Sequence, residues 1–385
     1  MHPMVKPALQ RAWRDRQAVQ FGVTPAQAVV LGPVDPATGC LLGLLDGTRG
    51  MELLRKEAQA MRLPDGQVDK LVARLAKAGL IDDATAGGPA VEALRNRPGT
   101  LDRLRPDLAS LSLVHPEPGA GAARLAARRA IRVQVRGAGR VGATVAALLS
   151  ASGVGRVEVL DGGSVLPGDV APGGFPPEAV GERRDAAARQ LVRRVAPGPP
   201  PRASAAAPGG SGPGGDGGPG LSLIVVAPRD GLDAYVPDPA LSAEWITSGT
   251  PHLYTGVIEG TGVVGPLVLP GGTACSGCLA LGRAERDPGW PRMVAQWRSG
   301  RRGAVPACDL GLATAAAGLA AAHALAFLDG ELPASTGSRW EASLPLLDWR
   351  PARITPHPDC GCGAGGHTEG VRASEAGSAH DTMAG

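Results

Sequence analysis

The chain has 385 residues, which is enough for two or three domains, and 43% of them are hydrophobic. Its 39 basic and 36 acidic residues leave a net charge of +3, which is too weak and too mixed to indicate a nucleic-acid partner. Residues 1–20 lack the apolar stretch of a secretory signal. No uncharged apolar run reaches the roughly 20 residues of a membrane span, so we expect a cytoplasmic protein without membrane contact.

Residues 1–95 have the pattern of a small α+β domain. The sequence predicts a strand over 28–31, amphipathic helices over 51–61 and 68–78, and a returning strand over 79–81. This order resembles a winged-helix module. Its helices carry few basic residues, which favours a peptide- or partner-binding domain over DNA readout, and a plain packing domain stays open as an alternative.

The rest of the chain divides by composition. Residues 96–130 contain several prolines around a short leucine-rich piece, and they are typical of a connector. An α/β domain follows over 131–363, in which 310–328 predicts a buried helix. Residues 197–220 are almost entirely Gly, Pro, Ala and Ser, so we expect a disordered insertion. The tail 364–385 lacks periodicity and is also predicted to be disordered.

A glycine motif opens the α/β domain. Residues 131–135 predict a strand, a G-x-G-x-x-G motif follows at once, and 143–150 continue as a helix. The helix N-terminus offers free N–H groups to an anion. A second strand, 157–160, ends at Asp161, where a carboxylate can bind a ribose hydroxyl. The pattern predicts a Rossmann-type fold, and a glycine-rich turn without a ligand is the alternative. The three motif glycines are Gly137, Gly139 and Gly142.

Four of the six cysteines form a C-x-x-C and a C-x-C pair in glycine- and proline-rich segments: Cys275, Cys278, Cys360 and Cys362. Two such turns supply four thiolates to one tetrahedral ion, which predicts a structural zinc site; a redox pair or a metal-free thiol cluster is the alternative. Cys40 lies in an apolar run and is expected in the core. Cys308 precedes a predicted helix, where packing is the default and a nucleophile the alternative.

Taken together, these motifs resemble the ThiF/MoeB/HesA family of ubiquitin-activating-enzyme-like adenylyltransferases. The resemblance covers about 130–363, and the segments 265–270 and 286–291 look most like one branch. That branch contains the ThiF-like partner proteins of azoline-forming peptide biosynthesis, whose winged-helix domain binds a precursor leader peptide. The resemblance implies a homodimer that uses ATP and Mg²⁺ to adenylylate the C-terminal carboxylate of a small carrier protein or peptide.

The positions that bind phosphate in this family are matched unevenly. Arg140 stands where the family loop has a glycine. Asp161 matches the first Asp of the family's D-x-D pattern, but Gly163 replaces the second. Asp169 falls where the family has an Asn, and Pro172-Gly173 replaces an Arg-Gln pair. The arginine that would clamp phosphate is therefore missing.

Two further positions concern catalysis. Arg184 falls where the family has a lysine, which keeps the charge but changes the shape. In a strict alignment Arg229 falls at the position of the family's magnesium-binding Asp, whereas a shift of one residue brings Asp230 to that position. The resemblance thus implies Asp230 and Arg184 as catalytic residues. The residues that would seat the nucleotide are Gly137, Gly139, Arg140, Gly142 and Asp161.

Three functions compete on this sequence. The first is a protein with a degenerate ATP site that binds a peptide or carrier protein and presents it to a separate enzyme. The second is an active ATP-dependent adenylyltransferase. The third is a nicotinamide or flavin oxidoreductase, which the glycine loop permits but which the cysteine pairs and the missing acid/base pair disfavour. Because several catalytic positions of the family are not matched, the sequence favours the first function, the binding protein with a degenerate ATP site.

Overall fold

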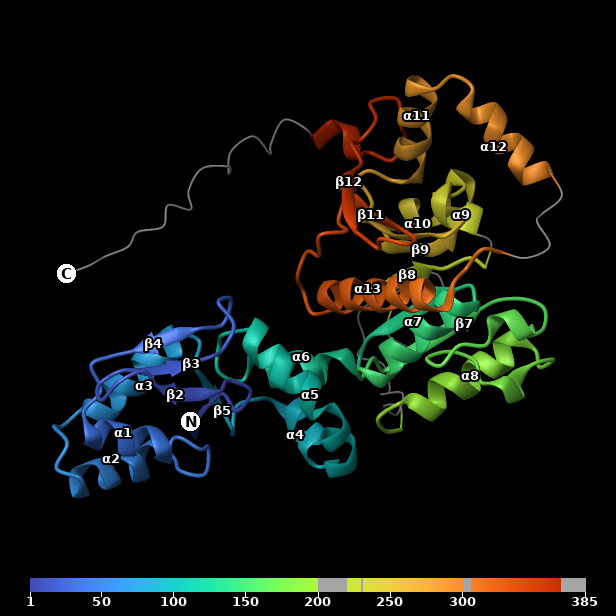
Figure 1. The fold of residues 1–385 in the computed structure, drawn as a ribbon. Coiled ribbons are helices and arrows are strands. Elements are labelled where there is room, and N and C mark those ends of the chain that lie inside the picture. Colours follow the sequence, from blue (N-terminus) through green and yellow to red (C-terminus); the bar gives the residue numbers. More distant parts are fainter. Residues whose placement is uncertain (200–219, 230, 301–305, 368–385) are drawn as a thin grey trace. The chain divides into compact units, whose positions relative to one another are not determined.

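The computed structural model describes residues 1–199, 220–229, 231–300 and 306–367. It divides into an N-terminal unit, formed by Met1–Ala130 with 197–199, and a C-terminal unit that begins at Ile131 (Figure 1). Most of the predicted insertion (200–219) and most of the predicted tail (368–385) lie outside the described residues. Each unit is described by itself below.

Residues 1–83 of the N-terminal unit combine short strands with three helices around one apolar core. Strands β2, β3 and β4 form an antiparallel sheet in that order, and β1 pairs antiparallel with β5. Apolar residues of β3, β4 and these three helices pack together. The elements are β1 (Pro3–Val5), β2 (Arg11–Trp13), β3 (Val19–Phe21), β4 (Val29–Leu31), α1 (Pro36–Leu44), α2 (Met51–Ala60), α3 (Gln67–Lys77) and β5 (Ile81–Asp83).

One core assignment in this unit was wrong. Cys40, expected in the core, is exposed on α1. Its neighbours Leu41 and Leu42 are buried. An apolar run inside a helix places successive side chains about 100° apart, so part of the run must face solvent.

The segment expected as a connector is helical. It contains α4 (Pro89–Arg95), α5 (Pro98–Val114) and α6 (Ala120–Arg128). Pro98 occupies the first turn of α5, where a proline is tolerated because its missing N–H has no partner in the helix. The fully buried Lys6 donates from Nζ to the carbonyl oxygen of Ser112 near the end of α5, which ties this helical segment to the rest of the unit. The leucines of the helices form a cluster of their own: Leu94, Leu104, Leu111 and Leu125.

The C-terminal unit is built on a seven-stranded mixed sheet with the order β12-β11-β10-β9-β8-β6-β7. The pairs β6–β7, β6–β8 and β8–β9 are parallel, and the remaining pairs are antiparallel. This arrangement confirms the predicted α/β fold class with a Rossmann-like half. The strands are β6 (Arg132–Arg136), β7 (Arg156–Leu160), β8 (Leu223–Val226), β9 (His252–Ile258), β10 (Thr261–Val268), β11 (Ser338–Ser343) and β12 (Arg350–Arg353).

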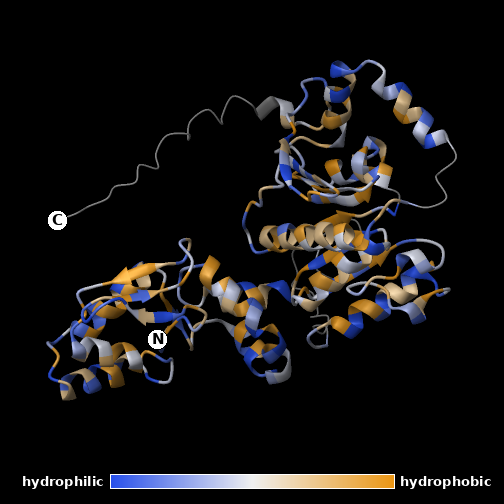
Figure 2. Cartoon of the chain, viewed as in Figure 1, coloured by the Kyte–Doolittle hydropathy of each residue, from blue (hydrophilic) through white to orange (hydrophobic). Residues whose placement is uncertain are grey.

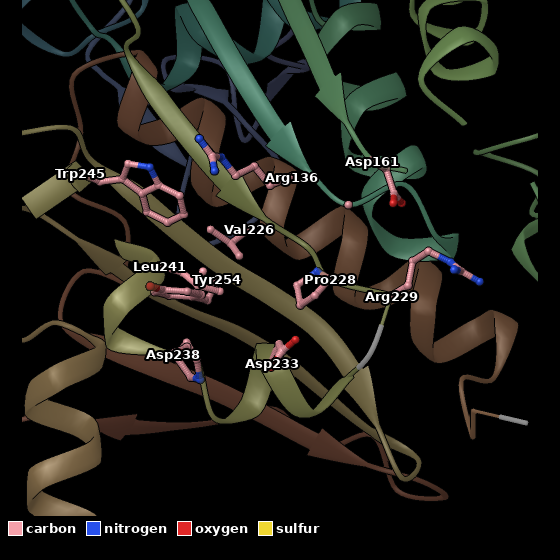
Figure 3. Close-up of a pocket in the computed structure, with 12 residues that line it drawn as sticks. Arg136, Asp161, Val226, Pro228, Arg229, Asp233, Asp238, Leu241, Trp245 and Tyr254 are labelled. Atoms are coloured by element: carbon pink, nitrogen blue, oxygen red, sulfur yellow. The ribbon is translucent and has the colours of Figure 1, made fainter. Parts of the chain in front are cut away.

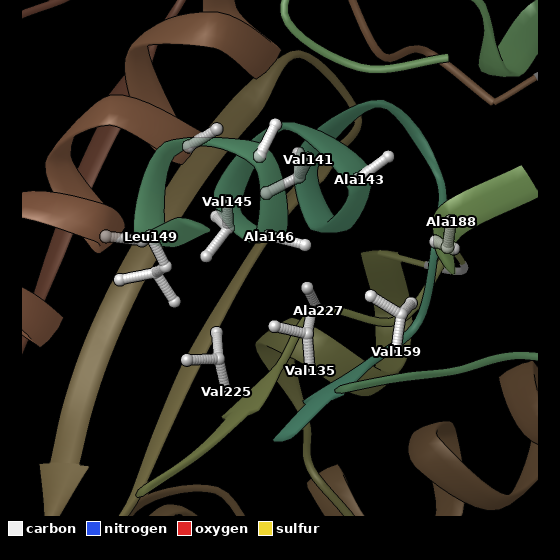
Figure 4. Close-up of a cluster of buried hydrophobic side chains, with 14 of the residues drawn as sticks. Val135, Val141, Ala143, Val145, Ala146, Leu149, Val159, Ala188, Val225 and Ala227 are labelled. Atoms are coloured by element: carbon white, nitrogen blue, oxygen red, sulfur yellow. The ribbon is translucent and has the colours of Figure 1, made fainter. Parts of the chain in front are cut away.

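Helices cover the two faces of this sheet. Val133 and Val135 of β6 belong to the main core together with residues of α7, and Figure 4 shows Val135 facing this core. Because side chains alternate along a strand, Arg136 faces the other side and stacks on Trp245 of α10. The helices are α7 (Arg140–Ala151), α8 (Arg184–Val195), α9 (Gly231–Tyr235), α10 (Pro239–Thr247), α11 (Ser276–Arg286), α12 (Trp290–Ser299) and α13 (Leu310–Leu328).

Helix α13 is the one helix among the described residues that is long and apolar enough to cross a membrane. Its mostly apolar residues are seen along the ribbon in Figure 2. In the structure it contacts α7, β9 and β10, and Leu312, Ala316 and Ala320 are buried in the main core. These contacts are those of a core helix, as the sequence predicted.

Candidate functional site

The glycine loop joins β6 to α7 at the carboxyl end of the parallel strands, where α/β sheets bind ligands. Gly137 has a φ of +105°, and a Cβ there would overlap the carbonyl oxygen of Ala227. A Cβ on Gly142 would overlap the carbonyl oxygen of Gly137. Both positions therefore require glycine. Gly139 is the N-cap of α7 and has no capping side chain, so the first N–H groups of the helix face the space in front of the loop.

Two residues predicted to bind the nucleotide, Arg140 and Asp161, form hydrogen bonds with backbone groups around the glycine loop. Arg140 donates from Nε to the carbonyl oxygen of Gly168 at 2.7 Å and from Nη1 to that of Cys308 at 2.8 Å. Asp161 accepts a hydrogen bond at Oδ2 from the N–H of Ala138 at 2.7 Å. The arginine thus joins three segments around the loop, and the carboxylate holds the loop backbone in place.

Asp169 is the centre of a buried ion-pair network. Its Oδ2 accepts from Nη2 and Nε of Arg184 at 2.8 and 3.2 Å, and its Oδ1 accepts from Nε of Arg229 at 3.1 Å. It also accepts from the N–H of Leu166 at 2.8 Å. Arg184 is 3% exposed, and its Nη1 donates to the carbonyl oxygen of Gly162. Buried charges need such partners because desolvation otherwise makes them costly.

Arg184, one of the two catalytic residues predicted from the sequence, is therefore paired with Asp169. Asp230 lies outside the described residues. Its neighbour Arg229 lies against the glycine loop. A Cβ on Gly139 would be only 3.0 Å from the Cγ of Arg229. Sequence reasoning missed the Asp169–Arg229 pair, because the two residues are 60 positions apart and no local motif links them.

Two cavities flank the loop. One, of about 280 Å³, lies in front of the α7 N-terminus, and Arg140, Asp169, Arg229 and Cys308 line it. Burial raises the pKa of the Cys308 thiol, although Arg140 opposes this effect. A raised pKa favours the neutral thiol, which agrees with a packing role for Cys308.

The other cavity, of about 380 Å³, extends along the opposite side of the sheet. Figure 3 shows Asp161 and Arg229 at one end of it and Trp245 and Tyr254 at the other. His252 packs edge-on against both aromatic rings, with centroids 5.2 and 5.5 Å away. Burial lowers the pKa of His252 to about 4, so this histidine is neutral at physiological pH.

The four paired cysteines converge on one point. Their Sγ atoms all lie within 4.8 Å of one another, and Cys275–Cys360 and Cys278–Cys362 are 3.6 and 3.5 Å apart. Tetrahedral zinc with bonds of about 2.3 Å places sulfur atoms about 3.8 Å apart, so the set fits this ion. A Cβ on Gly277 would approach Cys360 Sγ to 2.9 Å, which explains a glycine inside the C-x-x-C turn.

The cysteine cluster joins segments that are distant in sequence. Cys275 and Cys278 lie at the start of α11, whereas the other pair follows β12. The apolar residues around them, among them Tyr254, Val268 and Ile354, form a separate small core. Burial raises the pKa of the Cys275 thiol, which favours its neutral form when no cation is bound.

The fold and this site define a Rossmann-like α/β unit with a four-cysteine cluster that could bind zinc. The ThiF family model matches residues 115–204, which include the glycine loop and Asp169. This match confirms the family resemblance predicted from the sequence. No curated protein sequence matches the chain.

Solved structures with the same fold cover nearly the whole chain. E. coli MccB with MccA-N7isoASN has a TM-score of 0.65 and 14% identity, and the match covers 94% of this chain and 99% of MccB. PaaA has a TM-score of 0.65 and 16% identity, with 91% and 99% covered. E. coli MccB with ATP has a TM-score of 0.63 and 14% identity, with 94% and 99% covered. At these identities the likeness establishes the shared fold.

Proposed function

We propose that this protein binds a peptide or small carrier protein and presents it to a separate enzyme, and that its ATP site is degenerate. The observation that carries this proposal is the Arg184–Asp169–Arg229 network beside the glycine loop. ThiF-family chemistry needs cationic groups on the triphosphate and a carboxylate on Mg²⁺. Here one buried carboxylate is instead hydrogen-bonded to two arginines.

The described residues fit ATP with Mg²⁺ poorly. Mg²⁺ prefers oxygen ligands, but the cationic Arg229 stands beside the loop where strict alignment places the magnesium Asp. Asp161 and Asp169 each hold protein N–H groups. Arg140 and Arg184, the two cations that the resemblance assigns to phosphate, are hydrogen-bonded to carbonyl oxygens. These contacts occupy several of the donors and carboxylate oxygens that a triphosphate with Mg²⁺ would use.

The alternative, an active adenylyltransferase, keeps one observation in its favour. The glycine loop and the uncapped N-terminus of α7 retain the geometry that binds phosphate. ATP-dependent pyrophosphate exchange separates the two functions. We expect no exchange and no ATP binding by calorimetry at millimolar nucleotide. Exchange that is lost in Asp230→Ala would establish the enzyme and refute the degenerate site.

We further propose that the peptide binds at the free edge of β4. Alternating hydrogen bonds run from Gly22 N to Gln10 O and from Arg14 N to Ala18 O. The pair between them, Ala12 and Gln20, therefore also exchanges hydrogen bonds, so the N–H and C=O of Gln20 point toward β2. Because Gln20 lies opposite Val30, the N–H and C=O of Val30 point away from β3. Val30 is 47% exposed, and the nearby Arg74 of α3 donates to the carbonyl oxygen of Gly32 at 2.6 Å. An extended peptide that pairs with β4 would therefore lie beside α3.

Replacing Val30 with proline tests this edge, because proline removes the outward N–H and leaves the bonds between β3 and β4 intact. The probe is a fluorescein-labelled synthetic peptide of alternating valine and threonine, which favours an extended strand, measured by fluorescence polarisation. We expect at least a tenfold loss of affinity, since one backbone bond and its neighbours are lost. Arg11→Pro, which makes the same change at the β2 edge, is the matched control. Equal losses in both variants would place the peptide elsewhere.

We also propose that the cysteine cluster holds one structural zinc ion. On the family resemblance, we propose a homodimer that acts in the cytoplasm. Sedimentation velocity of the full chain measures its oligomeric state directly.

A further inference from the structure

The cavity of about 380 Å³ on the α10 side of the sheet is lined by a cation that is only partly paired. Arg136, the last residue of β6, donates from Nε to Oε1 of Gln134 at 2.9 Å. Its guanidinium carbon lies 4.7 Å from the ring centroid of Trp245. Within the part of the chain that the structure describes, Nη1 and Nη2 of Arg136 have no hydrogen-bond or ion-pair partner. Both groups are therefore available to a ligand that accepts hydrogen bonds.

The end of the cavity around Arg136 is otherwise apolar. Trp245 and Tyr254 are almost completely buried, whereas Leu241 of α10, which lines the same cavity, is 66% exposed. Figure 3 shows the guanidinium of Arg136 beside Trp245 at this end. His252, which packs against both rings, adds no charge there because burial lowers its pKa to about 4. An apolar wall beside an incompletely paired cation favours a ligand with an apolar body and one anionic group.

Three carboxylates also line the cavity, and each of them has a partner in the protein. Asp161 accepts from a backbone N–H of the glycine loop at 2.7 Å, and Asp238 accepts from a backbone N–H at the start of α10 at 3.0 Å. Asp233 is partnered as well. The groups of the cavity that most need a ligand are therefore the Nη1 and Nη2 donors of Arg136. A cationic ligand at the three carboxylates is the alternative.

We propose that the Arg136–Trp245 end of this cavity binds a carboxylate that carries an aromatic or other apolar group. The carboxylate accepts hydrogen bonds from Nη1 and Nη2 of Arg136, and the apolar group packs against Leu241. This chemistry occurs in a small aromatic acid and in the last residue of a peptide. The site requires neither a nucleotide nor Mg²⁺, so the inference does not depend on whether the ATP site is degenerate.

Hydrocinnamate is the probe, and its binding to the full-length protein is followed by ligand-observed NMR. We expect saturable binding with a dissociation constant of about 1 mM or lower. The primary amide of hydrocinnamate, which has the same shape without the charge, should bind roughly tenfold more weakly, because hydrogen bonds to a charged acceptor are stronger. Phenylpropylamine, the matched cation, should bind more weakly still. Preferential binding of the amine, or equal binding of the amide, would overturn the proposal.

Substitutions at the two ends of the proposed ligand test the site from the protein side. Arg136→Gln should weaken the binding of hydrocinnamate roughly tenfold or more, and Arg136→Lys, which keeps the charge but loses the paired donors, should lie between. Leu241→Ser should weaken the acid and its amide alike, and it changes an exposed side chain, so circular dichroism should show an unchanged fold.

Arg132→Gln is the matched control. Arg132 lies on the same strand and the same face as Arg136, but it pairs with Glu158 at 3.0 Å and does not line the cavity. This variant should bind hydrocinnamate like the unchanged protein. If Arg136→Gln also binds it unchanged, the carboxylate is held elsewhere and the proposal is wrong.

A peptide that ends in phenylalanine, acetyl-Gly-Gly-Phe, separates the two sources of the carboxylate. Binding much tighter than that of hydrocinnamate, and lost in the C-terminal amide of the peptide, would assign the site to a peptide terminus. Similar or weaker binding of the peptide would assign it to a small acid. In both cases the loss of affinity in Arg136→Gln should persist.

Discussion

Replacing Cys275 with serine is expected to abolish the binding of one zinc ion per chain and to destabilise the C-terminal unit strongly. Structural zinc contributes about 10–16 kcal/mol of apparent binding free energy in small zinc domains, which exceeds the effect of most single core substitutions. Elemental analysis measures the metal, and thermal unfolding measures the stability. The expected loss is large because Cys275 and Cys278 are nearly fully buried and cannot be solvated without unfolding the site.

The zinc prediction has a control within the same chain. Cys40→Ser changes a cysteine that is exposed on α1, far along the sequence from the cluster. It should retain one zinc ion and an unchanged melting temperature. Chelation of the unchanged protein should reproduce the Cys275→Ser phenotype. Purified protein without metal, or full stability after chelation, would contradict a structural zinc site.

Replacing Asp169 with alanine is the second prediction with a large effect. The substitution leaves the guanidinium of Arg184 buried without its anionic partner and also removes a partner of Arg229. Breaking a buried ion pair by removing one partner costs about 3–5 kcal/mol. We therefore expect a much lower urea midpoint of unfolding. A partner-matched variant, Asp169→Leu with Arg184→Met, should recover much of this stability, because a buried apolar pair has no charge to compensate.

Asp185→Ala provides the comparison for Asp169. Asp185 pairs with Arg183 and Arg189 at the surface, where solvent screens the charges. Its removal should change the unfolding midpoint far less than the removal of Asp169. Equal effects of the two substitutions would show that the Asp169 network is not a buried structural element, and the argument for a degenerate ATP site would lose its main support.

The sequence predicted the features that depend on local pattern. The strand–glycine loop–helix order was predictable because Gly137 and Gly142 meet steric demands that no other residue satisfies. The convergence of the cysteines was predictable because two short Cys pairs in glycine- and proline-rich segments have the spacing of zinc ligands. The long helix over 310–328 followed from its length and apolar composition. Periodicity did not reveal that prolines at 98 and 106 lie within helix α5.

The partners of the charged side chains depended on the tertiary structure. Family alignment assigned Arg140 and Arg184 to phosphate, whereas folding brings both beside carbonyl oxygens and brings Arg184 and Arg229 to Asp169. That Nη1 and Nη2 of Arg136 have no partner among the described residues also depended on packing. By itself, the sequence determined the glycine loop and the cysteine pairs, because local backbone geometry and ligand spacing act over a few residues. The tertiary structure alone decided how the charges pair, because an ion pair depends on distance in space and leaves no spacing in the chain.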